Sequence, residues 1–258
     1  MDLVINATLE EMPATAIALP QYGSYWLNVL ACINEEKGSF PLGELFKQLN
    51  GFSGRWVVMS PIHWEATHND AFIIATGEDL PFTDEESRAL FTAISEFLAE
   101  ETLYYHDAHH WLMKVDGKPA LNSHPPSQLL HHSLMPELKR MDKTLYWQRL
   151  FTEIQMYLAG HAQYPQLMIN GFWFYGDGEL TLAAKKSIFT DDPQLLNLFA
   201  HQMQPLTKDL QISEQTVWIS QQFLPLESCL QKHNTHWLWN NKAYTMPAKS
   251  WWKRLLSI

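Results

Sequence analysis

The apolar stretch from Met168 to Tyr175, MINGFWFY, is interrupted only by Asn170 and Gly171. A strand buried on both faces of a sheet carries a near-continuous apolar run of this kind, whereas a half-buried strand alternates apolar and polar residues. The stretch therefore predicts a strand in the interior of a sheet. It is followed by the loop Gly176-Asp177-Gly178.

Helical and strand patterns alternate on both sides of this stretch. Thr83 and Glu86 form a capping box at the start of a helix predicted over Thr83–Glu101. An apolar stripe predicts a second long helix from Asp142 to Ala159, and Gly160 is its expected end. Further helices are expected at Tyr22–Ile33, Phe40–Leu49 and Pro193–Met203, from Leu224, and at Lys249–Leu256. Two strands are expected at Arg55–Met59 and Ala71–Thr76, joined through Pro61 and a polar turn. Further strands are expected at Leu103–Tyr105, Trp111–Val115 and Thr216–Ser220. A hairpin is expected at His236–Thr245, with its turn at Asn240-Asn241.

This alternation predicts an α/β fold with a mixed β-sheet and helices on its faces. A proline-rich connector from Pro119 to Pro126 is the plausible domain boundary. It divides the chain into an N-terminal α+β half, residues 1–120, and a C-terminal α/β half, residues 121–258. We expect the two halves to pack intimately, and a single compact unit is the alternative.

The composition is globular and excludes several classes of protein. A formal net charge of −10 argues against a nucleic-acid-binding protein, which needs a basic face to displace counterions from phosphates. No apolar run approaches the roughly 18 residues that a membrane-spanning helix requires. Cys32 and Cys229 form no CxxC pair, and the first residues show no secretory signal, so we expect a cytoplasmic protein with reduced thiols.

A candidate ligand site follows from the predicted interior strand. In open α/β sheets, ligands bind at the carboxyl ends of strands, and Asp177 could there bind a cation or a hydroxyl group. The alternative is a plain tight turn that uses glycine for positive φ. The loop lacks the third glycine of GxGxxG and the Lys-Ser/Thr of a P-loop, so it predicts no dinucleotide or ATP site. The full set of expected ligand-binding residues is His63, Glu153, Gln155, Asn170, Trp173, Gly176, Asp177 and Gly178.

Histidine is the most suggestive side chain, because eight of the twelve lie between His63 and His132. Neither HExxH nor another diagnostic metal-ligand spacing is present, so we expect no metal. The alternative is a divalent-metal site. Convergence of His63, His68, Asp70, His106 and Asp177 on one point would favour it.

Several of these segments together resemble the RpfE-type family of bacterial regulatory proteins, often labelled cofactor-independent phosphoglycerate mutase-like. The resemblance lies in Trp56 to His63, in Trp147 to the run Glu153–Met156, and in Ile169 to Gly178, and it extends to the closing Trp251–Arg254. The chain departs from the family pattern at Ser60 in place of Asp, at Thr152 in place of Asn and at Asp177 in place of Gly.

The resemblance implies a regulatory protein whose scaffold is related to that of the phosphoglycerate mutases and alkaline phosphatases. The chain has no Asp-His dipeptide and no early Asp-Gly-x-Gly-Asp, which the true metal-dependent mutases carry. We therefore expect a regulatory or small-ligand-binding protein without a complete catalytic site or cofactor, whose partner is a small anionic ligand or a protein. The alternatives are a metal-dependent phosphoryl-transfer enzyme and an interaction protein that acts through an exposed apolar surface.

Overall fold

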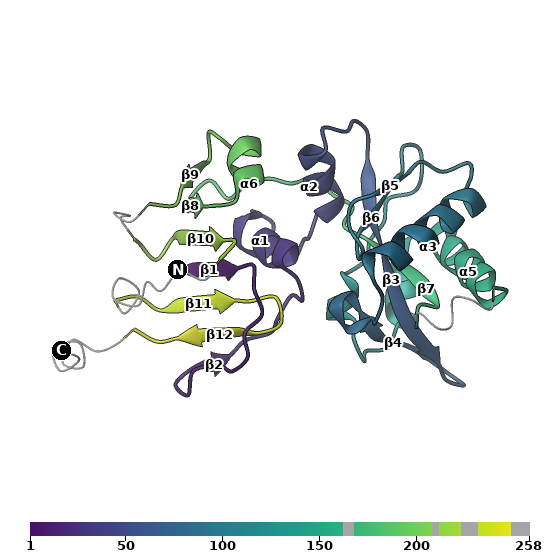
Figure 1. Cartoon of the computed structure of the whole chain (residues 1–258), viewed down its shortest axis with the longest axis horizontal. Coiled ribbons are helices and arrows are strands. Elements are labelled where there is room, and N and C mark those ends of the chain that lie inside the picture. The colour runs from purple at the N-terminus through teal and green to yellow at the C-terminus, as the bar shows by residue number, and fades with distance from the viewer. Residues whose placement is uncertain (162–167, 208–211, 223–231, 249–258) are drawn as a thin grey trace. The chain divides into compact units, whose positions relative to one another are not determined.

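The computed structural model describes residues 1–161, 168–207, 212–222 and 232–248 (Figure 1). The helices expected from Leu224 and over Lys249–Leu256 lie outside the described residues. The chain has a mixed α/β fold, as the alternating patterns predicted. It divides into two compact units, of which the first comprises Met1–Ser39 with Thr181–Ile258 and the second Phe40–Leu180. In the described part of the chain, no helix is both long and apolar enough to span a bilayer.

The first unit is built on a seven-stranded sheet with the strand order β2-β12-β11-β1-β10-β8-β9. Its five strands from β11 to β9 run parallel, and β12 and β2 complete one edge with antiparallel pairing (Figure 1). Helix α1 packs against β1 and β10. The elements are β1 (Asp2–Ile5), β2 (Ile17–Ala18), α1 (Tyr25–Ile33), β8 (Ser187–Thr190), α6 (Pro193–Leu198), β9 (Met203–Pro205), β10 (Thr216–Ser220), β11 (Thr235–Leu238) and β12 (Ala243–Met246).

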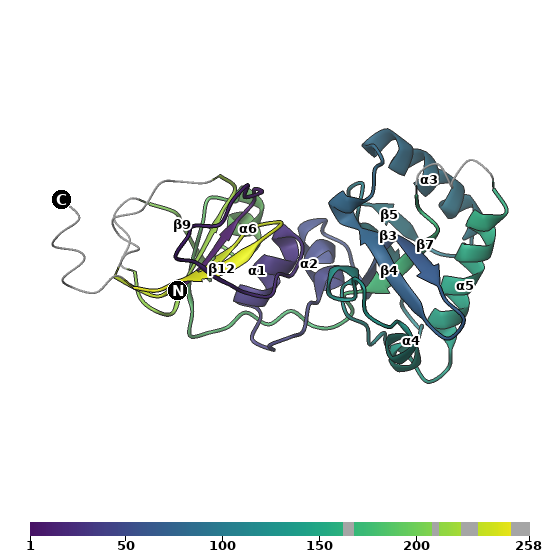
Figure 2. The ribbon, with the colours of Figure 1, turned by 90° about the horizontal axis from the view of Figure 1, so that it is seen from below.

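The second unit is built on an antiparallel sheet with the order β4-β3-β6-β5, and β7 pairs with β3. Every residue of β7 is buried, which confirms the interior strand predicted from MINGFWFY. Helix α5 lies alongside β7, and α4 packs against α5 (Figure 2). The elements are α2 (Leu42–Leu49), β3 (Trp56–Ala66), β4 (Ala71–Thr76), α3 (Asp84–Phe97), β5 (Leu103–Tyr105), β6 (Trp111–Lys114), α4 (Met135–Met141), α5 (Tyr146–Ala159) and β7 (Gly171–Tyr175), with short 3₁₀ turns at Gly77–Asp79 and Pro126–Gln128.

Pro61 lies inside strand β3 and not in the turn that was expected there. Residues Trp56–Met59 pair with β6 and residues Ile62–Ala66 pair with β4, so Pro61 falls between these two ladders on one edge of β3, while Phe172 of β7 lies opposite Pro61 on the other edge. A proline is tolerated at such a place because neither of these ladders requires its missing N–H. The prediction of a break at Pro61 was therefore wrong.

The compact units differ from the expected halves, residues 1–120 and 121–258. The connector from Pro119 to Pro126 lies within the second unit, and the chain leaves the first unit near Ser39 and returns to it at Thr181. A unit formed by both ends of the chain has no single linker, so no local change of composition marks its boundary.

Helix α5 starts four residues later than expected because Asp142 lies ahead of it as a capping residue. One carboxylate oxygen accepts hydrogen bonds from the backbone N–H groups of Thr144 (2.6 Å) and Tyr146 (3.2 Å), and the other accepts from that of Trp147 (3.0 Å). Leu145 between them adopts a left-handed conformation with φ 61°. The carboxylate thus satisfies N–H groups that the first helical turn leaves without partners.

We expect Asp142→Asn to destabilise the fold by about 2 kcal/mol at neutral pH, since it weakens several charge-assisted hydrogen bonds. Burial raises the pKa of Asp142, but the hydrogen bonds from Thr144, Trp147 and Tyr146 together outweigh it, so the pKa lies below its usual value. A lowered folded-state pKa gives stability that is present above the unfolded-state pKa of about 4 and is lost as the pH falls through the folded-state value. Urea unfolding of wild type and Asp142→Asn at neutral pH and at a pH below the folded-state pKa checks the prediction. The prediction fails if the difference in unfolding free energy between wild type and variant is the same at the two pH values.

Candidate functional site

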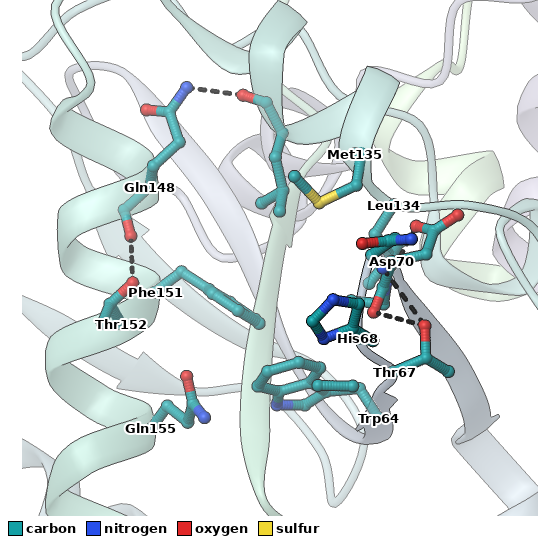
Figure 3. A pocket seen from close by; sticks show the side chains of 14 residues that line it. Trp64, Thr67, His68, Asp70, Leu134, Met135, Gln148, Phe151, Thr152 and Gln155 are labelled. Atoms are coloured by element: carbon teal, nitrogen blue, oxygen red, sulfur yellow. Dashed lines mark hydrogen bonds between the residues drawn. The ribbon is translucent and has the colours of Figure 1, made fainter.

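The second unit contains a pocket of about 370 Å³ between the β3–β4 hairpin, helix α4 and helix α5. We call it the hairpin pocket. Figure 3 shows Phe151 and Gln155 extending from α5, with Trp64 and His68 of the hairpin opposite them. Leu134, immediately before α4, contributes a further apolar wall.

The floor of the hairpin pocket is aromatic. The ring centroids of Trp64 and Phe151 lie 5.6 Å apart in a tilted arrangement. The indole of Trp64 packs directly on Gly171 of β7, where a Cβ atom would lie 3.0 Å from both Cδ1 and Nε1 of the indole. A larger residue at position 171 would push the indole from this place. The glycine that interrupts the apolar run MINGFWFY therefore sets the position of the pocket floor.

Asn170 fixes the backbone of Trp64. Its side-chain carbonyl oxygen accepts from the Trp64 N–H (2.9 Å), and its Nδ2 donates to the Trp64 carbonyl (2.7 Å). The pairing of β3 with β4 shifts register between His63 and Trp64. The side-chain amide thus satisfies backbone groups at an irregularity of the sheet, and Asn170 positions the pocket floor without lining the pocket.

The rim of the hairpin pocket is polar. The hairpin turn is closed by hydrogen bonds between Thr67 and Asp70, including one from the Thr67 N–H to the Asp70 carbonyl (2.7 Å). The turn presents the side chains of His68 and Asn69, and α5 presents Gln155. Within the described residues, these three side chains have no hydrogen-bond partner. A ligand can therefore bond to them without displacing a hydrogen bond of the described residues.

The pocket carries little charge. Among the described residues that line it, Asp70 is the only carboxylate, and none is a lysine or an arginine. One oxygen of Asp70 accepts from the Ala71 N–H (2.7 Å) and the Ser133 hydroxyl (2.8 Å), so this carboxylate also holds the hairpin in place. The pocket therefore suits a ligand that is mainly apolar and carries a few polar groups.

Of the eight ligand-binding residues expected from sequence, Gln155 lines the hairpin pocket. Glu153 is exposed on α5. His63 contacts the Met168 carbonyl through Nδ1 (3.0 Å) and lies 3.8 Å from a carboxylate oxygen of Glu65 through Nε2.

The glycine loop lies at the opposite end of β7. Val58 pairs with Tyr175 and Ile62 pairs with Gly171, so the strand separates Gly176 from Asn170 by roughly 20 Å at 3.3 Å per residue. The single cleft expected for the loop, His63, Glu153 and Gln155 is therefore not formed.

Contacts at this far end of β7 are structural. The Gly176 carbonyl accepts from the Gly43 N–H (3.0 Å), and one Asp177 oxygen accepts from the Leu121 N–H (2.8 Å). The other Asp177 oxygen lies 3.4 Å from Nε of Arg55. Gly176 and Gly178 both have positive φ, as the tight-turn alternative requires. Trp173 is fully buried in the core.

The condition set for a metal enzyme is not met by the described residues, which contain no group of three or more His, Cys, Asp or Glu side chains placed to hold a metal ion. His106 stacks on Phe46 with the ring centroids 3.9 Å apart, and burial lowers its pKa. His68 and Asp70 lie in the β3–β4 hairpin and Asp177 lies beyond β7. The five side chains named for this test therefore lie at three places, the β3–β4 hairpin, the loop after β5 and the loop after β7, and do not converge on one point.

Sequence reasoning missed most of the hairpin pocket. Trp64 and His68 lie in a hairpin that was expected to break at Pro61, and helix α4 was not predicted. Phe151 was assigned to the apolar stripe of its helix, which is correct, but the same ring also faces the pocket. The sequence did carry a signal for this pocket, because an aromatic side chain, Trp64, and a titratable side chain, His68, lie close together near a turn between two strands.

The fold and the pocket define a two-unit α/β protein with an aromatic-floored pocket in its second unit. No protein-family model, no curated protein and no solved structure matches the chain.

Proposed function

We propose that this chain is a non-catalytic protein of the regulatory type that the RpfE resemblance implies, and that it binds a small ligand in the hairpin pocket. The carrying observation is the pocket itself, in which an aromatic floor of Trp64 and Phe151 meets a rim of polar side chains that have no hydrogen-bond partner among the described residues. Its volume of about 370 Å³ lies within the usual range for small-molecule sites.

The chemistry of the lining favours a planar, uncharged ligand. Aromatic faces attract planar rings through stacking, and His68, Asn69 and Gln155 supply donors and acceptors for its polar edge. A small anionic ligand, as expected from sequence, finds no lysine or arginine among the lining residues. We therefore place neutral rings ahead of anions.

The same lining supports binding in preference to catalysis. Catalysis by a nucleophile or by an acid–base pair needs two such groups within hydrogen-bond reach of one substrate atom. Among the described lining residues, His68 and Asp70 are the acid–base candidates, and Asp70 already accepts bonds from Ala71 and Ser133. The hydroxyl groups of Thr67 and Thr152 donate to the backbone carbonyls of Asp70 and Gln148. No free pair of such groups is therefore found among the described lining residues, which leaves ligand binding as the function that the site supports best.

Ligand-observed NMR with a panel of small planar compounds tests the proposal. The panel pairs neutral rings such as quinoline and nicotinamide with anions such as benzoate. We expect saturation transfer to neutral rings and a loss of affinity of about tenfold or more in Trp64→Ala, because one stacking contact contributes about 1–3 kcal/mol. Trp64→Phe should retain most of the affinity.

Two further variants control for folding. His68→Ala changes an exposed side chain at the hairpin tip and should weaken binding without altering the unfolding midpoint. Met156→Ala, at a position of α5 that is 70% exposed and outside the pocket lining, should leave binding unchanged. The proposal fails if no compound binds, or if binding is the same in wild type, Trp64→Ala and His68→Ala.

A further inference from the structure

The methionines of this chain differ widely in exposure. Several are fully buried in the core, namely Met59, Met113 and Met141. Four of the described methionines are at least 40% exposed, namely Met12, Met135, Met156 and Met168. Exposure governs how readily the thioether sulfur is oxidised to the sulfoxide, because the oxidant must reach the sulfur. The chain therefore has one set of thioethers that is open to oxidants and another that the fold protects.

Met135 is the exposed methionine that belongs to the lining of the hairpin pocket. It is the first residue of α4 and is 41% exposed. Its side chain extends from the start of α4 toward the α5 side of the pocket (Figure 3). The other exposed methionines are not lining residues. Oxidation of Met135 therefore changes the pocket itself, whereas oxidation of the others leaves the lining as it is.

The wall of the pocket at α4 is apolar. Its lining side chains are Leu134, Met135 and Leu138, whereas the polar rim comes from the β3–β4 hairpin and from α5. A thioether suits such a wall because it is flexible and polarisable and packs well against aromatic rings. A sulfoxide at the same place carries a polar oxygen, and the two neighbouring leucine side chains offer it no hydrogen-bond donor. A ring that covered this oxygen would remove its water without replacing the hydrogen bond, which is unfavourable.

We propose that Met135 is an oxidation site at which hydrogen peroxide, or another two-electron oxidant, weakens ring binding in the hairpin pocket. This role depends on ligand binding in the pocket, the function proposed above. The sulfur lone pair attacks one peroxide oxygen, and the S–O bond forms as the O–O bond breaks. The departing hydroxide takes up the proton of the transferred hydroxyl group and leaves as water, so sulfur loses two electrons and the peroxide gains them. A methionine sulfoxide reductase reverses the change.

The same arrangement predicts that a bound ligand protects Met135. A ring seated on Trp64 and Phe151 fills the space in front of the α4 wall and keeps the oxidant from the sulfur. The protection should be local, because Met156 lies on α5 outside the pocket lining. A saturating ligand should therefore slow the oxidation of Met135 in proportion to the occupied fraction of the protein and leave the rate at Met156 unchanged.

The test treats the full chain with hydrogen peroxide and uses quinoline and nicotinamide as probes of the pocket. Peptide mass spectrometry should find one added oxygen atom at Met135 and at Met156, whereas the buried Met59 and Met113 stay unmodified. Affinity for the probes should fall about tenfold as Met135 is oxidised, because a polar group is then buried without a partner. The unfolding midpoint should stay the same, and reductase treatment should restore the affinity.

Two variants assign the effect to one sulfur. Met135→Leu keeps an apolar side chain in the wall and removes the sulfur, so it should bind the probes within about threefold of wild type and lose no affinity in peroxide. Met156→Leu is the matched control, since it removes a more exposed sulfur outside the lining and should lose affinity in peroxide as wild type does. Both variants keep Cys32 and Cys229, so an effect of cysteine oxidation would appear in each.

Three results would overturn the role of Met135 and leave ligand binding in the pocket intact. Met135 could stay reduced while Met156 is oxidised, the oxidised protein could bind the probes as tightly as the untreated protein, or Met135→Leu could lose affinity in peroxide as wild type does. A different result, in which neither probe binds the untreated protein, would overturn the proposed function and with it the role of Met135. The titration before peroxide treatment thus separates the two failures.

Discussion

Gly43→Ala is expected to destabilise the chain by roughly 3 kcal/mol or more, because the new methyl group has no space. A Cβ atom at this position of α2 would lie 2.2 Å from the carbonyl oxygen of Trp56 and 2.9 Å from the Cα atom of Val57. Both neighbours belong to the backbone of β3, so no side-chain rotation relieves the overlap. The N–H of Gly43 also donates to the Gly176 carbonyl, and this bond would lengthen as the helix moves away.

The gain in helix propensity from alanine, about 1 kcal/mol, is smaller than this loss. Gly160→Ala is the matched control, since its φ is ordinary and its Cβ would lie 3.5 Å from the nearest atom, in normal van der Waals contact. Urea unfolding followed by circular dichroism should separate the two variants clearly. Equal midpoints for Gly43→Ala and Gly160→Ala would show that α2 does not pack on β3 as closely as described.

Local signals were sufficient for the elements that the sequence predicted. The capping box of Thr83 and Glu86 is present at the start of α3, with each residue bonded to the other's backbone. The apolar run became β7, and the turn at Asn240-Asn241 separates β11 from β12. These features depend on neighbours along the chain, and the sequence displays such neighbours directly.

The strands that were missed are short and carry no local mark. Strands β1 and β8 have four residues each, and their stability comes from lying between other strands of the sheet. In the sequence, the acidic pair Asp191-Asp192 has no feature that distinguishes it from ordinary surface or helix-end charge. Asp192 does cap α6, but it is 2% exposed and is bonded to Tyr25, which is 167 positions away in the sequence. Only the parallel register explains why polar residues after separate apolar runs meet.

The candidate site likewise depends on strand pairing that cannot be read from the sequence. The predicted strand was correct, but its antiparallel pairing with β3 sends Gly176 toward Val57 and Asn170 toward His63. Gly176 and Asn170, which follow and precede the same strand, therefore lie at opposite ends of the sheet and not in one site. Gly171 and Asn170 do take part in building the hairpin pocket, through the contact and the hydrogen bonds that hold Trp64. Their role follows from sheet pairing, which the sequence does not display.

Trp173→Ala is expected to cost about 4 kcal/mol of stability, because it leaves a large cavity in the core. Trp173 was expected to contact a ligand, but its side chain is fully buried, it packs edge-on against Phe151 with the centroids 5.8 Å apart, and its indole N–H donates to the His124 carbonyl (3.0 Å). Any effect of Trp173→Ala on ligand binding should therefore result from its effect on the stability of the fold. Phe151 would lose a neighbour, and the floor of the hairpin pocket would loosen.

Trp173→Phe keeps an aromatic ring in the same place and removes the indole donor, so it should cost about 1–2 kcal/mol and remain folded at room temperature. Chemical denaturation gives the stability of both variants, and ligand titration of the folded Phe variant separates core packing from direct contact. A core role predicts that Trp173→Phe binds ring compounds within about threefold of wild type, which corresponds to less than about 1 kcal/mol of binding free energy. Wild-type stability in Trp173→Ala together with lost binding in Trp173→Phe would instead make this tryptophan a ligand contact, and the description of β7 as a buried strand would then be wrong.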